Sequence, residues 1–248
     1  MVDENLIFGL HAVQAALEQN PDTVQALWLD NKRHDRRMAR IIELAQQAGT
    51  PLHQVERQEL DRRVPSGRHQ GVLAQCAAPT TGSEADLAAL LERLDEPPFL
   101  LVLDGVTDPH NLGACLRSAD AAGVHAIIAP KDRAASLTPT AIKVASGAAQ
   151  TVPFIQVTNL SRTLRELKQA GIWLVGLDGH AEQSLYALDL KGPLAIVMGA
   201  EGQGLRRLSK EHCDFLALIP MVGTVESLNV SVAAGICLFE ALRQRSSS

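Results

Sequence analysis

The chain has 248 residues, of which 46% are hydrophobic and 21% charged, and it carries a net charge of −5 at pH 7. This composition is typical of a globular protein with a sizeable core, and no apolar run approaches the roughly 20 residues of a membrane span. The N-terminus lacks the basic region of a signal peptide and the four cysteines are scattered, which favours a cytoplasmic protein with free thiols and no metal.

The first 78 residues alternate between helical and strand-like patterns. Apolar residues recur at helical spacing over 9–19, 33–49 and 57–64, and short apolar runs typical of strands occupy 24–30, 51–56 and 71–77. The alternation predicts a small α/β domain at the N-terminus.

Within this region, four arginines predict a basic helix face. They follow the spacing i, i+3, i+4 and i+7, while a different face is apolar through Met38, Ile41, Ile42 and Ala45; the four are Arg33, Arg36, Arg37 and Arg40. A solvated charged face is the usual explanation, and contact with RNA phosphates is the more specific one. Because aromatic residues make up only 3% of the chain, any RNA bound at this face would be held by phosphate contact and RNA shape and not by base stacking.

Residues 79–96 carry nearly all of the net negative charge. This segment holds 1 Lys or Arg against 5 Asp or Glu, whereas residues 1–78 hold 9 against 10 and residues 97–248 hold 13 against 13. It begins "PTTGSE" and continues as a short acidic helix, so we expect a linker. With both flanking regions close to neutral, a nucleic-acid partner is not excluded.

Residues 97–248 predict a second, larger α/β domain with a parallel sheet. Short apolar runs begin near residues 99, 124, 152, 173, 193 and 215, helical patterns fill most of the gaps, and a final helix follows the last run. In such sheets ligands bind where loops leave the carboxyl ends of the strands.

Three of these loops contain residues suited to a binding site. In "DPHNLGACLRSADAAGV", we expect Asn111 to cap a helix, with Arg117 beside its packing stripe. In "LAIVMGAEGQGL", glycines surround a single charge, Glu201. In "LIPMVGTVESLNVSVAAGICLFEAL", Asn229 is a second expected cap, before a helix rich in small residues.

Each loop has an ordinary structural explanation. Asn111 could be only a cap and Arg117 a solvated side chain, the glycines could form a plain turn, and the small residues could serve packing within the domain or between subunits. Three such loops at one end of one sheet are harder to attribute to coincidence.

At these residues the chain resembles the SpoU/TrmH family of S-adenosylmethionine-dependent RNA ribose 2′-O-methyltransferases, in the SPOUT class. All three family motifs occur in order, and the first 78 residues, ending in "RHQGVLA", resemble the family's substrate-binding domain, similar to ribosomal protein L30/L7Ae modules. The nearest likeness is to bacterial enzymes that methylate a guanosine in the peptidyl-transferase P loop of 23S ribosomal RNA. Another ribosomal or transfer RNA nucleotide remains the alternative.

The resemblance implies a set of site residues and an architecture. The implied catalytic residues are Asn111, Arg117, Glu201, Ser227 and Asn229. The implied S-adenosylmethionine-binding residues are Gly199, Ile219, Met221 and Leu228. A C-terminal trefoil knot and a homodimer with a shared active site are also implied, although general connection rules would argue against a knot.

Two other classes of function remain open from the residues alone. An NAD-dependent oxidoreductase would suit an α/β sheet with a glycine loop, but the spacing here is G-x-x-G-x-G and not G-x-G-x-x-G. A non-catalytic RNA-binding module would explain the arginines but not the three ordered loops. Binding of S-adenosylmethionine and methyl transfer to RNA would separate the three possibilities.

Overall fold

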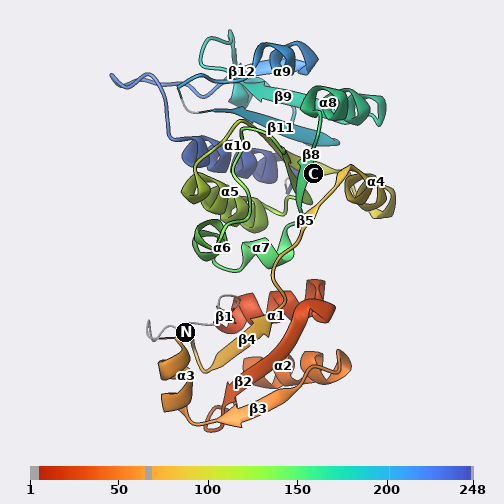
Figure 1. Cartoon of the computed structure of the whole chain (residues 1–248). Coiled ribbons are helices and arrows are strands. Elements are labelled where there is room, and N and C mark those ends of the chain that lie inside the picture. Colours follow the sequence, from red (N-terminus) through yellow and green to blue (C-terminus); the bar gives the residue numbers. More distant parts are fainter. Residues whose placement is uncertain (1–5, 65–68, 201, 247–248) are drawn as a thin grey trace. The chain divides into compact units, whose positions relative to one another are not determined.

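The computed structural model describes residues 6–64, 69–200 and 202–246, which divide into two compact units, Met1–Pro79 and Thr80–Ser248. Each unit is an α/β fold (Figure 1). Among the described residues, no helix combines the length and the apolar character that crossing a membrane requires.

The first unit is built on a four-stranded mixed sheet. The strand order is β1-β4-β2-β3, with β2 parallel to β3 and antiparallel to β4, which in turn is antiparallel to β1. The elements in chain order are β1 (Leu6–Phe8), α1 (Leu10–Gln19), η1 (Pro21–Thr23), β2 (Val24–Asp30), α2 (Arg36–Gln47), β3 (Leu52–Val55), α3 (Arg57–Arg63) and β4 (Val72–Cys76). All six elements expected from the sequence are present, and β1 and η1, too short to show a periodic pattern, are additional.

Helices α1 and α2 share a core with the sheet of this unit. The apolar stripe of α2 is buried as expected, with Met38 1% and Ile41 0% exposed. Asp35 caps the helix by accepting hydrogen bonds from the backbone N–H groups of Arg37 and Met38. The predicted helix start at residue 33 is therefore wrong, because the cap places Arg33 before the helix and outside its basic face.

The second unit contains an eight-stranded sheet in which every pairing is parallel. Its order is β10-β12-β9-β11-β6-β7-β8-β5. The strands are β5 (Thr81–Gly82), β6 (Phe99–Asp104), β7 (Ala126–Pro130), β8 (Phe154–Val157), β9 (Trp173–Leu177), β10 (Gln183–Ser184), β11 (Leu194–Gly199) and β12 (Phe215–Leu218). The six apolar runs of the sequence became six of these strands, and the two-residue edge strands β5 and β10 were not expected.

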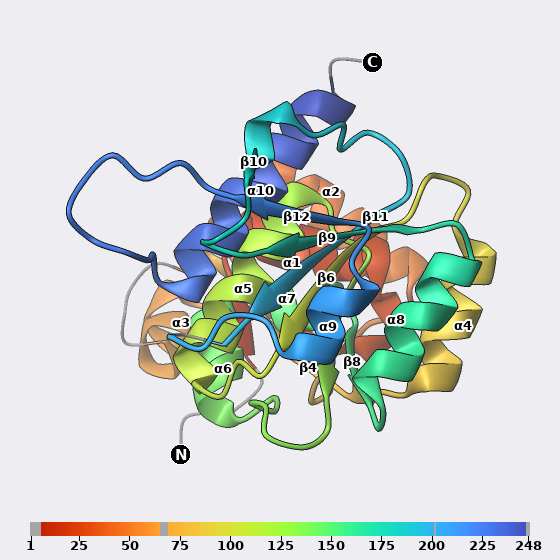
Figure 2. The same cartoon turned by 90° about the horizontal axis from the view of Figure 1, so that it is seen from above.

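Helices cover both faces of this sheet (Figure 2). One core joins the sheet to α5, α6, α7 and α10, and the other joins it to α4 and α8. The helices are α4 (Glu84–Arg93), α5 (Pro109–Ala122), α6 (Pro139–Ala145), α7 (Ala148–Thr151), α8 (Leu160–Gln169), α9 (Arg207–His212) and α10 (Val230–Arg245), with a short η2 (Leu185–Ala187). Burial on both faces explains why β6 reads as an unbroken apolar run, since all six of its residues are buried.

The segment expected to be a linker contributes structure to the second unit. Residues 79–96 contain β5, which pairs with β8, and α4, whose start is fixed by a reciprocal capping box between Ser83 and Asp86. Glu84 also accepts a hydrogen bond from the backbone N–H of Thr158. Two of the five acidic residues of this segment, Glu84 and Asp86, therefore lie in the first turn of a helix, where negative charge is favoured.

Candidate active site at the carboxyl edge of the parallel sheet

The loops that follow β6, β11 and β12 leave the same edge of the sheet, because all of these strands are parallel. Gly199, the last residue of β11, is paired with Asp104, the last residue of β6, so the first two loops begin side by side. Strand β12 lies two positions farther along, beyond β9. The strands before the first and third loops are not neighbours, so the two loops are brought together through helix α10, which follows the third loop.

The first and third loops meet through two asparagines. Asn229 Nδ2 donates a hydrogen bond of 2.9 Å to Asn111 Oδ1, and Asn111 is only 7% exposed. Asn229 also caps α10, as predicted, by accepting from the backbone N–H of Ser231 at 2.9 Å. One amide side chain thus starts a helix with its oxygen and holds the neighbouring helix with its nitrogen.

The predicted capping role of Asn111 is wrong. Helix α5 begins at Pro109, and Asp108 caps it by accepting from the backbone N–H of His110 at 2.9 Å. Asn111 consequently lies in the first turn of the helix, where its side chain is turned to α10. The sequence "DPHN" offered two capping residues, and Pro109 decides between them because proline is favoured at the first helical position.

Arg117 projects from a different face of α5. Its side chain is exposed, and within the described part of the chain it makes no hydrogen bond or ion pair. At 100° per residue, Arg117 and Asn111 point in directions roughly 120° apart. A single copy of the chain therefore does not bring these two predicted site residues together.

The second loop closes on itself. Ala200 and Gly204 form an antiparallel bridge, with Ala200 N donating to Gly204 O at 3.0 Å and Gly204 N donating to Ala200 O at 2.9 Å. Gly202 and Gly204 have φ of +73° and +66°, which explains two of the glycines, and a Cβ on Gly199 would lie 2.0 Å from the Gly204 carbonyl carbon. Glu201 lies outside the described residues.

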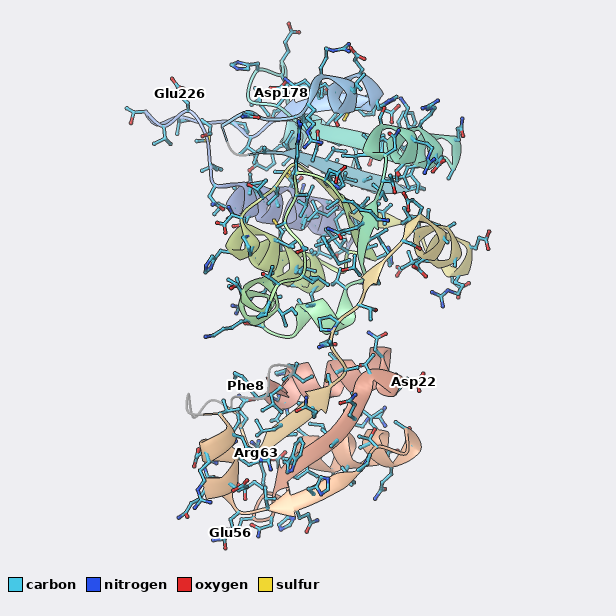
Figure 3. All side chains as sticks on the ribbon, in the orientation of Figure 1. Phe8, Asp22, Glu56, Arg63, Asp178 and Glu226 are labelled. Atoms are coloured by element: carbon cyan, nitrogen blue, oxygen red, sulfur yellow. The ribbon has the colours of Figure 1, made fainter. Side chains whose placement is uncertain are left out.

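The third loop extends away from the sheet between β12 and α10 (Figures 1 and 2). Glu226 lies near its outer end (Figure 3), and Ser227 is exposed beside it. Met221 is 39% exposed, whereas Ile219 is half-buried against the core and Leu228 is half-buried where the loop returns. The four residues expected to bind cofactor thus lie on two loops of one edge, and three of them (Ile219, Met221 and Leu228) present apolar side chains that are exposed or half-buried.

Two residues of this edge were not singled out from the sequence. Asp104 is fully buried at the end of β6, and its Oδ2 accepts from the backbone N–H of Arg206 at 3.0 Å. Asp104 is the one charged residue in "FLLVLDGV", which could have marked it. Nothing local in the sequence connects it to Arg206, 102 positions later.

Cysteine nucleophiles and metal clusters are not features of the described residues. All four cysteines are free; burial raises the pKa of Cys76 to about 11 and that of Cys213 and Cys237 to about 12. These thiols are therefore protonated at neutral pH. Within the described ranges, no three His, Cys, Asp or Glu side chains form a group that could hold a metal ion.

Small residues of α10 pack within the unit. The helix contacts α5, and a Cβ on Gly235 would lie 3.7 Å from Ser118 Oγ, so the close approach is between these two helices. A second face of α10 exposes Val232 (50%) and Phe239 (48%). Packing within the domain explains the small residues, and it leaves the exposed apolar face unexplained.

Comparison with known proteins identifies both units. Residues 98–239 match the SpoU rRNA Methylase family and residues 6–82 match the domain described as RNA 2′-O ribose methyltransferase substrate binding. Proteins named 23S rRNA (guanosine-2′-O-)-methyltransferase RlmB are 56% identical in Pseudomonas putida, over 96% of both chains, and in Shewanella oneidensis, over 100% of both. The crystal structure of the SpoU methyltransferase AviRb from Streptomyces viridochromogenes with AdoMet is 27% identical, with a TM-score of 0.67 over 98% of this chain and 91% of that one. The chain therefore belongs to the SpoU rRNA methylase family, with an N-terminal substrate-binding domain and a C-terminal methylase domain.

Proposed function

We propose that this protein transfers a methyl group from S-adenosylmethionine to the ribose 2′-hydroxyl of a guanosine in the peptidyl-transferase P loop of 23S ribosomal RNA. The observation that carries the proposal is the meeting of the family's loops at one sheet edge, in a chain whose full-length relatives bear the RlmB name. The same family acting on another ribosomal or transfer RNA nucleotide is the alternative.

The residues at this edge suit a cofactor held mainly by backbone. Added Cβ atoms on Gly202 and Gly204 would meet nothing within 4 Å, so the outer side of the second loop is open to a ligand. Ile219, Met221 and Leu228 add apolar surface from the third loop, which suits an adenine ring, and Gly199 keeps the second loop closed. S-adenosylmethionine supplies a methyl group on a positively charged sulfur, so the proposed reaction needs no metal.

The protein's own contribution is to orient the nucleophile. A ribose hydroxyl is a very weak acid, so alignment and stabilisation of developing negative charge provide much of the rate. Arg117 has an exposed guanidinium without a protein partner among the described residues, which leaves its donors available to a phosphate. We assign it a positioning and electrostatic role, because arginine stays protonated in proteins and is poorly suited to act as a base.

The other proposed catalytic residues have distinct roles. Asn111 and Asn229 fix the start of α10 against α5 through their 2.9 Å hydrogen bond. Ser227 is exposed two residues before Asn229, where it can contact the nucleotide. Glu201 belongs to the set on family resemblance alone.

RNA recognition is proposed for the N-terminal domain, with an L30/L7Ae-like fold. Arg36 and Arg37 are exposed, and neither pairs with an acid within the described residues. Arg33 instead pairs with Asp35, and Arg40 pairs with Glu43 at 2.9 Å. The proposed phosphate contacts of α2 therefore rest chiefly on Arg36 and Arg37.

A homodimer in the cytoplasm, with a trefoil knot in the methylase domain, completes the proposal. The exposed Val232 and Phe239 on α10 suit a subunit interface. A second copy could also place its own Arg117 near the sheet edge that contains Asn111, because Arg117 and Asn111 of one chain point in different directions. Light scattering of active protein at micromolar concentration tests this, and a monomeric mass would contradict it.

The test of function is methyl transfer itself. Purified protein, S-adenosylmethionine and unmodified 23S ribosomal RNA are incubated, and 2′-O-methyl positions are mapped by mass spectrometry. We expect one methylated guanosine in the P loop. Methylation of transfer RNA or of another ribosomal position would support the alternative, and NAD binding without methyl transfer would overturn the proposal.

A further inference from the structure

A pocket lies between the first and second loops of the methylase domain. It has a volume of about 240 Å³, and its walls come from the loop after β6, the loop after β7 and the loop after β11. The lining includes Gly105, Thr107, Arg133, Gln203, Gly204 and Arg206. None of the expected cofactor-binding or catalytic residues that the structure describes lines it, and Glu201 lies outside the described residues.

Beneath the pocket, the Asp104 carboxylate holds Arg206. Its Oδ2 accepts from the backbone N–H of Arg206, and its Oδ1 lies 3.4 Å from Arg206 Nη1. That Oδ1 is buried and makes no hydrogen bond within the described structure, which is costly for a carboxylate. The Arg206 guanidinium is the cation that offsets this buried charge in the described structure.

Gly105 provides the space in which the guanidinium lies. Its φ of +91° is a conformation that glycine adopts without strain, and an added Cβ would lie 3.2 Å from Arg206 Nη2. A Cβ at this position would be strained by the backbone and would push the guanidinium by a few tenths of an ångström. Asp104 and Gly105 thus fix Arg206 from two sides, one by charge and the other by absence of a side chain.

The lining residues offer several donors to an anion. The Arg206 side chain stays 46% exposed despite its ion pair, and Arg133 enters the lining from a backbone with φ of +55°. The Gln203 amide and the Thr107 hydroxyl complete a lining with two arginines and, among its described members, no acid. Guanidinium groups match the geometry of phosphate oxygens particularly well.

We propose that this pocket binds a phosphodiester group of the RNA substrate, next to the ribose that is methylated, and that Asp104 is a positioning residue acting through Arg206. The inference rests on the proposed function. The cofactor's carboxylate is a second possible anion, because Gly204 of the second loop belongs to the lining. RNA fits better, because three of the four expected cofactor residues (Ile219, Met221 and Leu228) lie on the third loop, which contributes nothing to the described lining.

The experiment compares Arg206→Ala with Arg207→Ala as a matched control. Arg207 is the adjacent residue, pairs with Glu211 on α9 and does not line the pocket. For Arg206→Ala we expect RNA affinity to fall roughly tenfold, as for loss of a charged hydrogen bond. The slope of log affinity against log salt should become shallower by about 0.7–0.9. KM for RNA should rise accordingly, with S-adenosylmethionine affinity unchanged by calorimetry. Arg207→Ala should match wild type in all four.

The positioning role of Asp104 has its own readout. Asp104→Asn should raise KM for RNA, and the double variant with Arg206→Ala should show no further rise, because both changes remove the same oriented guanidinium. Arg206→Lys should restore the salt slope but only part of the affinity. If Asp104→Asn unfolds the domain, the Arg206 series still decides the phosphate site.

Several results would overturn the inference. An unchanged RNA affinity and salt slope in Arg206→Ala, with active wild-type enzyme, would refute the phosphate site and leave the proposed function standing. Loss of S-adenosylmethionine affinity with unchanged RNA affinity would assign the pocket to the cofactor carboxylate. If wild type binds RNA but methylates none, the proposed function fails, and RNA affinity alone still decides the pocket.

Discussion

Substituting Gly199 with alanine should break the second loop from within. The new Cβ would lie 2.0 Å from the Gly204 carbonyl carbon and 2.2 Å from the Leu205 nitrogen, whereas real Cβ contacts are essentially never below 3.0 Å. The loop backbone must therefore retreat by about 1 Å. The family resemblance implies that Gly199 contacts the cofactor, and the structure shows that the missing side chain also makes room for the protein's own loop.

The magnitude follows from the contacts that the retreat disrupts. Two backbone hydrogen bonds join Ala200 and Gly204, each contributing a net ~0.5–1.5 kcal/mol, and crowding a packed site typically costs ~1–3 kcal/mol. A combined loss of about 2–6 kcal/mol corresponds to a fall in Tm of roughly 4–24 °C for a domain of this size. S-adenosylmethionine affinity should fall with it, because the loop that is expected to hold the cofactor loses its shape.

Differential scanning calorimetry and cofactor titration measure both effects, with two glycine controls. Gly202→Ala introduces strain at φ of +73° without a contact within 4 Å, so it should cost only about 1–2 kcal/mol. Gly192→Ala has neither a left-handed backbone nor a neighbour within 4 Å and should be close to neutral. If Gly199→Ala melts and binds cofactor like Gly192→Ala, the steric argument is wrong.

The remaining predictions concern the other proposed residues. Arg117→Ala should abolish methyl transfer while Tm and cofactor affinity stay within error of wild type, because its exposed side chain makes no described contact; near-normal turnover would remove it from the site. A double-mutant cycle of Asn111→Ala and Asn229→Ala should give a coupling energy of about 0.5–1.5 kcal/mol by denaturation, and strict additivity would show that their hydrogen bond contributes nothing. Reversing the charge at Arg36 and Arg37 should weaken RNA binding and reduce its salt dependence more than charge reversal at Arg40, which already pairs with Glu43. Cofactor affinity should be unchanged in all of these variants. Equal RNA binding by all variants and wild type would show that this helix face is only a solvated surface.

Local patterns in the sequence determined most of the secondary structure. Burial on both faces makes strands such as β6 continuous apolar runs, and the side-chain spacing of α2 separates its buried stripe from its arginines. Both elements could therefore be predicted without knowing which other elements pack against them. The motif residues could be placed on loops at one sheet edge for the same reason, because parallel strands with helical connections all end there.

The choice between neighbouring candidates for a helix cap was harder to predict from the sequence. Asp108 and Asn111 are both good caps, and only the position of Pro109 favours Asp108. Before α2, the spacing of the arginines extended the expected helix past its cap, Asp35. As a result, the Asn111 side chain accepts a hydrogen bond from Asn229 instead of capping α5, and Arg33 lies before the start of α2.

Tertiary structure alone decided which distant residues meet. The order β10-β12-β9-β11-β6 places the end of β11 beside that of β6, and only then can Asp104 hold Arg206, 102 positions away. The Asn111–Asn229 bond likewise depends on α10 packing against α5. Periodicity reports which face of an element is buried, but not which element covers it, so the partners of these side chains were settled by packing across the whole domain.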